Sequence, residues 1–181
     1  MPQAAAQEAR AATCGDGGDP PLARLAGRPL PALTLPSTSG EHVELAELDR
    51  AVLYFYPGHV CSPEGGYDSP ALDDAQHRAF AHHWSDFLAL NCMALGISSQ
   101  SSHEQSVTAS ALGIGHPLLC DRDRMLAQQL GLPTFTVDHI GWYCRLTLVV
   151  DDGVIARAFY PVTSATRSPA QAVWWMRQRW N

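Results

Sequence analysis

The sequence predicts an α/β sandwich in which helices flank a central mixed sheet. The first observation is a continuous apolar run, "AVLYFYP" at residues 51–57, which is typical of a strand buried on both faces. The second is the alternation of strand-like and helix-like segments from there to about residue 131. The third is a strand, a tight Asp-Gly turn and another strand within 142–160, which predicts an antiparallel pair at the end of the sheet.

Local signals justify the first elements in order. Residues 28–48 alternate apolar and polar side chains around Ser39-Gly40, which indicates short strands or a hairpin before the main sheet. Ser69 at an N-cap and Pro70 at the first helical position predict the start of a helix. Its apolar face is predicted from helical spacing to hold Leu72, Ala75, Ala79, Phe80, His83, Trp84, Phe87 and Leu88.

The later elements follow in the same way. A second buried strand is predicted at 92–98, and the helices after it are predicted to stop at Gly113 and Gly131. An irregular stretch should begin at residue 132, before the strands at 142–150 and 154–160. A last helix opens at Ser168-Pro169, and its apolar side is predicted to carry Val173, Trp174 and Trp180.

Length and composition predict one domain and exclude several functions. The chain has 181 residues, 46% of them apolar, so we expect a single domain at 23–181 after a disordered N-terminal arm at 1–22. The arm lacks the apolar core of a signal peptide, and no run of 18 apolar residues follows, so we expect a cytoplasmic protein without membrane contact. The net charge of −6 and the scattered arginines argue against nucleic acid, and the absence of lysine excludes Schiff-base chemistry.

The cysteines are predicted to be free thiols. They number five, without Cys-x-x-Cys spacing, in a chain large enough to fold without disulfides: Cys14, Cys61, Cys92, Cys120 and Cys144. Cys92 and Cys120 lie in apolar strands, which predicts packing roles. Strand alternation should point Cys144 away from the face that its neighbour Arg145 occupies.

Several segments, in this order, make the chain resemble a known family. They are "VLYFYP", "LGISSQSS", "HPLLCDRD", "LGLPTF" and "RLTLVVDDGVIARAFYPV". From about Gly27 onward the sequence resembles the peroxiredoxins of the AhpC/TSA class, near the bacterioferritin-comigratory type. The resemblance implies a thioredoxin-like fold and a thiol peroxidase that needs no cofactor. It also implies a peroxide substrate and an external thiol reductant, and leaves a homodimer open.

The loop after the first core strand departs from the family pattern Pro-x-x-x-Thr/Ser-x-x-Cys. Counted from Pro57, Cys61 stands where the family has threonine, and Glu64 stands where it has the reactive cysteine. The related branch has a longer loop, of which "PEGGYD" matches the first piece. The cysteine-containing piece is missing, because residues 72–80 hold Asp73 and Arg78 instead.

Cys61 is the candidate nucleophile of the predicted site. It follows a core strand and precedes Ser62-Pro63, a candidate helical turn whose backbone N–H groups would favour a thiolate. Glu64 would disfavour that thiolate, whereas the resemblance assigns Arg145 the role of steadying it and polarising the peroxide. His59 is a candidate base, two residues before the cysteine. The predicted pocket residues are Tyr56, Pro57 and Ser62.

The sequence suggests three other interpretations, of which the second and third stay open. The histidines, with His82 and His83 adjacent and His77 nearby, suggest metal binding, but their spacing fits no strong zinc pattern, so no metal site is predicted. The chain is alternatively an inactive family member whose pocket binds a small molecule or a partner, in which case Glu64 would form an ion pair with Arg145. A monothiol oxidoreductase of the thioredoxin kind is the third interpretation.

Overall fold

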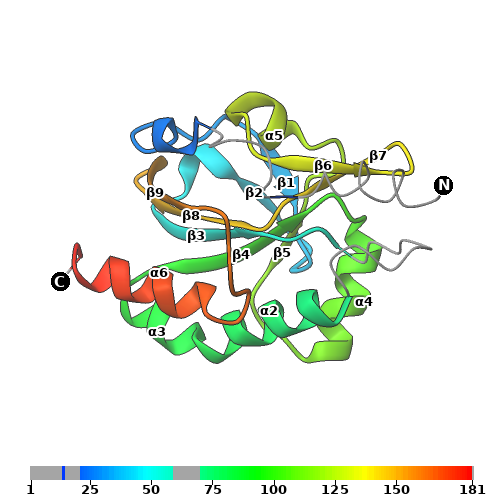
Figure 1. Ribbon diagram of the computed structural model, residues 1–181. Coiled ribbons are helices and arrows are strands. Elements are labelled where there is room, and N and C mark those ends of the chain that lie inside the picture. The colour runs from blue at the N-terminus through cyan, green and yellow to red at the C-terminus, as the bar shows by residue number, and fades with distance from the viewer. Residues whose placement is uncertain (1–13, 15–20, 59–69, 181) are drawn as a thin grey trace.

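A five-stranded mixed sheet forms the centre of the protein (Figure 1). The computed structural model describes residues 14, 21–58 and 70–180. The strand order is β5-β4-β3-β8-β9, in which β3, β4 and β5 are parallel and β8 and β9 are antiparallel to their neighbours. The strands are β3 (Arg50–Phe55), β4 (Met93–Ser98), β5 (Leu118–Cys120), β8 (Leu146–Asp151) and β9 (Val154–Phe159). The predicted mixed α/β sheet is therefore confirmed.

Helices cover both faces of this sheet (Figure 1). One face packs against α2 (Pro70–His82), α3 (Trp84–Ala89) and α6 (Ser168–Arg177), and the other packs against α5 (Met125–Leu130). The helix α4 (Ser102–Leu112) precedes β5. Alternation along β3 divides its side chains, because Val52 and Tyr54 join the α2 side while Leu53 and Phe55 join the α5 side.

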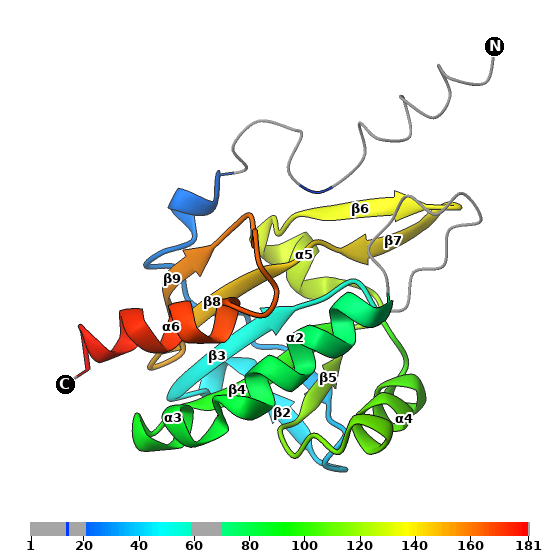
Figure 2. The ribbon, with the colours of Figure 1, turned by 60° about the horizontal axis from the view of Figure 1, so that its bottom comes forward.

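Two small hairpins complete the strands. The first, β1 (Thr34–Pro36) with β2 (His42–Glu44), is the predicted early hairpin, and the short helices η1 (Pro21–Arg24) and η2 (Leu45–Glu47) flank it. The second, β6 (Thr134–Val137) with β7 (Ile140–Tyr143), lies beyond one end of the main sheet (Figure 2). An irregular stretch was the wrong prediction for this segment, because β6 and β7 satisfy their backbone hydrogen bonds with each other.

The predicted strand at 142–150 divides in two. Trp142 and Tyr143 end β7, whereas the main-sheet strand β8 begins only at Leu146. Cys144 and Arg145 therefore occupy the break between two sheets, and the strict alternation assumed for a single strand does not apply across it. From this break, Arg145 reaches Asp73 and Gln76 near the N-terminal end of α2.

Caps and turns follow the local signals closely. Ser101 and Glu104 form a capping box at the start of α4, and Gly113 ends that helix with a left-handed φ of 63°. Gly131 ends α5 with a φ of 71°. In the β8–β9 turn, Asp152 and Gly153 both have positive φ, as the predicted Asp-Gly hairpin requires.

The last helix begins at Ser168 as predicted, but its buried side differs from the prediction. Ala172, Val173 and Met176 are buried, whereas Trp174 is 65% exposed. Trp180 is half-buried, and its indole Nε1 donates a hydrogen bond to Asp151. The buried residues lie at i, i+1 and i+4 on one stripe, and Trp174 projects from the other side of the helix.

The N-terminal arm at 1–22 falls mostly outside the described residues and stays a prediction. So does Ser69 as the N-cap of α2. Within the described part of the chain, no helix is both long enough and apolar enough to cross a membrane.

Candidate functional site

The buried face of α2 is polar near its N-terminus. Asp73, Gln76, His77 and Phe80 are buried, at the spacing i, i+3, i+4 and i+7 of a single helical face. The predicted face was wrong at two positions at least, because Leu72 is 38% and Leu88 is 56% exposed. The helical periodicity was predicted correctly. The buried face was not, because the prediction assumed that polar side chains such as Asp73 and Gln76 face water.

Arg145 supplies the reason that these polar side chains are buried. Its guanidinium Nη2 donates to Asp73 Oδ1 at 2.6 Å, and its Nη1 donates to the Gln76 side-chain oxygen. Arg145 is only 6% exposed, and Asp73 only 2%. A buried arginine without a partner would be strongly unfavourable, so the carboxylate compensates a charge that water does not reach.

The helix itself also favours a negative charge at this place. Asp73 lies in the first turn of α2, where the free backbone N–H groups carry the positive end of the helix dipole. The Asp73 carboxylate therefore lies near two positive charges, the guanidinium of Arg145 and the positive end of the α2 dipole. The site is built to hold an anion, and Asp73 provides it.

A cavity of about 360 Å³ opens beside Arg145. Its wall includes Leu72 from α2, Cys14 from the N-terminal segment and the chain between Tyr160 and Thr166. Arg145 thus borders a space large enough for a small molecule, while its guanidinium is bound by Asp73.

Two buried tyrosines, Tyr54 in β3 and Tyr56 just after it, form polar contacts on the α2 side of the sheet. The Tyr54 hydroxyl lies 2.8 Å from His77 Nδ1 and 2.6 Å from His116 Nε2, and burial holds its pKa well above the usual value. Tyr56, a predicted pocket residue, is 1% exposed and accepts a hydrogen bond from Gln105 Nε2 at 3.3 Å. Its position is therefore interior, and its hydroxyl is held by Gln105 of α4.

His116 is expected to make stability depend on pH. It is 2% exposed, and burial lowers its pKa from 6.5 to about 4. As pH falls, the unfolded chain binds this proton first, so the contribution is complete above pH 6.5 and is lost between about 6.5 and 4. At 1.36 kcal/mol per unit, the loss amounts to about 3 kcal/mol of unfolding free energy.

Urea unfolding at pH 7, 6, 5 and 4.5 measures this loss. Carboxylates contribute to acid unfolding as well, so the test is the difference between the wild type and His116→Gln, which keeps a polar group toward Tyr54. We expect a shallower decline in the variant over this range. Parallel declines for the two proteins would contradict a neutral His116 in the fold.

The predicted site residues divide into two groups. Arg145, Tyr56 and Pro57 are described, and all three are buried. The other four lie outside the described residues and remain predictions: His59, Cys61, Ser62 and Glu64. Sequence reasoning missed Asp73 and Gln76 as partners of Arg145. The available signal was an arginine within an otherwise apolar segment, since a buried cation requires an anion elsewhere in the chain.

The prediction of free cysteines was wrong for one pair. Cys14 forms a disulfide with Cys144 across 130 residues of sequence, while Cys92 and Cys120 are free and buried as predicted. Cys144 could not be paired from the sequence, because the contact depends on where the chain near residue 14 lies against the β7–β8 break.

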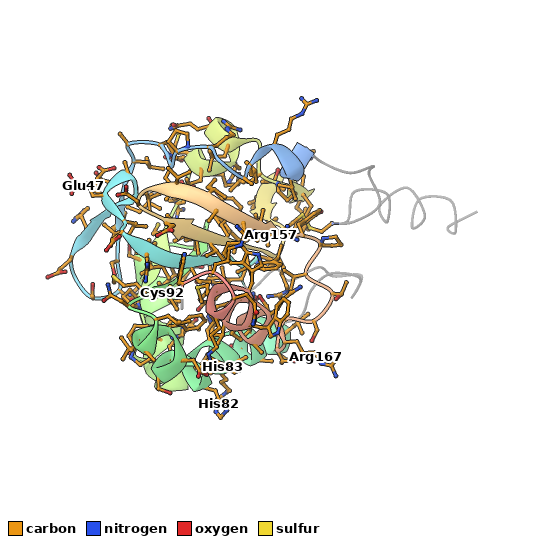
Figure 3. The ribbon with its side chains drawn as sticks, turned by 90° about the vertical axis from the view of Figure 1, so that its left-hand side faces the viewer. Glu47, His82, His83, Cys92, Arg157 and Arg167 are labelled. Carbon is orange, nitrogen blue, oxygen red and sulfur yellow. A yellow bond between two sulfur atoms is a disulfide. The ribbon has the colours of Figure 1, made fainter. Side chains whose placement is uncertain are left out.

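The adjacent histidines lie away from this site. His83 Nδ1 is 2.8 Å from Asp86, which also binds Arg177, and Figure 3 shows His82 and His83 at the edge of the molecule. Among the described residues, no group of three or more histidine, cysteine and acidic side chains is arranged to hold a metal ion.

Comparison with known proteins gives the family. Residues 26–158 match the AhpC/TSA family. A Mycobacterium tuberculosis (strain H37Rv) protein provisionally named a peroxiredoxin is 32% identical over 145 residues, which cover 75% of this chain and 85% of that protein. A Helicobacter pylori protein with the same provisional assignment is 24% identical over 142 residues, which cover 75% of this chain and 88% of that protein.

Solved structures agree in fold. The peroxidoxin BcpB of Mycobacterium tuberculosis aligns with a TM-score of 0.71 at 21% identity, over 85% of this chain and 97% of that one. A bacterioferritin comigratory protein of Xanthomonas campestris, studied for its alkyl peroxide reduction activity, aligns with a TM-score of 0.70 at 20% identity, over 84% of this chain and 97% of that one. The chain therefore belongs to the AhpC/TSA family, the peroxiredoxin-type thiol peroxidases of the thioredoxin superfamily.

Proposed function

We propose that this protein reduces hydrogen peroxide or an organic hydroperoxide through Cys61. The Cys61 thiolate attacks the peroxide, the O–O bond breaks, and the sulfur becomes a sulfenic acid while an alcohol or water leaves. A first external thiol condenses with the sulfenic acid to a mixed disulfide and releases water, and a second thiol attacks that disulfide, which returns Cys61 to the thiol and releases the oxidised reductant. His59 accepts the thiol proton, and Glu64 raises the thiol pKa by its charge.

The observation that carries this proposal is the position of Arg145. Phe55 pairs with Leu146 in the β3–β8 ladder, so Tyr56 and Arg145 come next at the same end of that ladder. Cys61 is five residues beyond Tyr56, which limits its Cα to about 18 Å from that residue along the chain. A buried arginine beside a cavity thus stands within reach of the one cysteine in the following loop.

Asp73 favours a second candidate function. Because its carboxylate already binds the guanidinium of Arg145, the charge that would polarise a peroxide is neutralised in this arrangement. The alternative is a repurposed family member whose cavity beside Arg145 binds a small molecule or a partner, without peroxide chemistry. A cytoplasmic location and a homodimer remain predictions under either function.

Replacing Cys61 tests the two functions. We expect Cys61→Ser to reduce peroxide consumption to the level of buffer, and to remove the one-oxygen adduct seen by intact mass after peroxide treatment. The control is Cys92→Ser, because burial raises the pKa of the Cys92 thiol to about 12 and keeps it protonated. This control should keep full activity and lose about 1–3 kcal/mol of stability by burying a hydroxyl. Equal consumption by Cys61→Ser and the wild type would exclude the peroxidase mechanism proposed for Cys61.

A further inference from the structure

The Cys14–Cys144 disulfide is asymmetric in its surroundings. Cys144 is 1% exposed and packs with Phe135 and Val137, in a cluster that Trp142 and Tyr160 extend. Cys14 is exposed and forms part of the wall of the cavity beside Arg145. Cys14 is therefore the solvent-facing residue of the pair, whereas Cys144 is shielded.

The cavity continues along the segment before α6. A second hollow of about 580 Å³ shares Val162, Thr163 and Ser164 with the first, and reaches Arg167 and Gln171. Together the two hollows form a groove, which we call the 160–171 groove, with Cys14 at one end and Arg167 at the other. Hydroxyl groups of threonine and serine line the part between them.

The two arginines of the groove differ in their charge balance. Arg145 is bound by Asp73, whereas Arg167 is exposed at the start of α6, where Figure 3 labels it at the edge of the molecule. Within the described part of the chain, the Arg167 side chain makes no hydrogen bond or ion pair. The uncompensated positive charge therefore lies at the end of the groove away from the disulfide, where it would attract a carboxylate.

We propose that the Cys14–Cys144 disulfide is redox-active, and that its reductant is a small thiol bearing a carboxylate that Arg167 binds in the 160–171 groove. The incoming thiolate attacks the Cys14 sulfur and forms a mixed disulfide, while the bond to Cys144 breaks and Cys144 takes up a proton. A second thiol attacks the mixed disulfide, which leaves Cys14 as a thiol and releases the oxidised small molecule. This exchange goes beyond the peroxidase function and does not require Cys61.

The test uses the oxidised full-length chain with Cys61→Ser, so that the peroxidase proposal cannot affect its result. The probes are the tripeptide thiol glutathione and its diamide, which differ by carboxylates against neutral amides and are long enough to extend along the groove. Iodoacetamide trapping followed by peptide mass spectrometry measures the rate at which Cys14 and Cys144 become thiols. Rates are expressed per thiolate, because the two probes differ in thiol pKa.

We expect glutathione to react about two- to fivefold faster than its diamide, as befits one exposed ion pair. Arg167→Gln should remove this preference, and the matched control Arg122→Gln, an exposed arginine outside the groove, should keep it. A disulfide that both probes leave intact until the protein is unfolded would overturn the proposal. So would a carboxylate preference that survives Arg167→Gln.

Discussion

Asp73→Asn is expected to lower the free energy of unfolding by about 3–5 kcal/mol, because it removes the buried carboxylate that Arg145 contacts at 2.6 Å. The asparagine has the same size, so the loss reports charge and not packing. Asp73 and Arg145 are 2% and 6% exposed, and their 2.6 Å contact lies where water cannot replace the missing carboxylate. Urea unfolding at neutral pH gives the difference.

Two comparisons separate this effect from a general loss of negative charge. Asp123→Asn removes a carboxylate from an exposed position and should change stability by no more than about 0.5 kcal/mol. The double variant Asp73→Asn with Arg145→Gln removes both charges and should regain much of the loss, since no uncompensated ion remains. A loss below 1 kcal/mol for Asp73→Asn alone would show that the pair is solvated in solution.

Asp73→Cys is expected to create a thiolate at neutral pH. The introduced thiol would stand in the first turn of α2 against the guanidinium of Arg145, so both positive sources that hold the carboxylate would hold the sulfur anion. A cation this close lowers an acidic pKa by about 1–3 units, which raises the thiolate fraction about 10- to 1,000-fold below the unshifted pKa.

The measurement is the pH dependence of iodoacetamide alkylation and of peroxide consumption, both in a Cys61→Ser background. Asp74→Cys is the matched control, because it puts a thiol one residue further along α2, on a side of the helix turned by about 100° from position 73. We expect the Asp73→Cys thiol to react with peroxide faster than the control thiol by about the ratio of their thiolate fractions. Equal pKa values for the two thiols would mean that Arg145 does not act on an anion at position 73.

The outcome also informs the choice between the two proposed functions. If the introduced thiol reacts quickly while Cys61 in the wild type does not, the surroundings of Arg145 can support peroxide chemistry and the wild type lacks only a suitably placed thiol. If Cys61 reacts quickly in the wild type, the neutralised Arg145 is compatible with peroxide chemistry in the preceding loop.

The sequence by itself determined the framework of this protein. The apolar run of β3, the capping signals of α4 and the Asp-Gly turn between β8 and β9 each act over a few residues, so they can be recognised without knowing what packs against them. The family resemblance extended that framework to a thioredoxin-like fold, and the structure confirms its central mixed sheet flanked by helices.

The tertiary structure alone decided which carboxylate pairs with Arg145 and which cysteine forms a disulfide with Cys144. Asp73 and Arg145 are 72 residues apart, and Cys14 and Cys144 are 130 apart, so neither contact leaves a periodic signal in the chain. Both arise at the break between β7 and β8, whose place depends on pairing with separate sheets. Polar residues are usually assigned to the surface, because burying a single charge is strongly unfavourable. An ion pair is an exception, since each charge compensates the cost of burying the other.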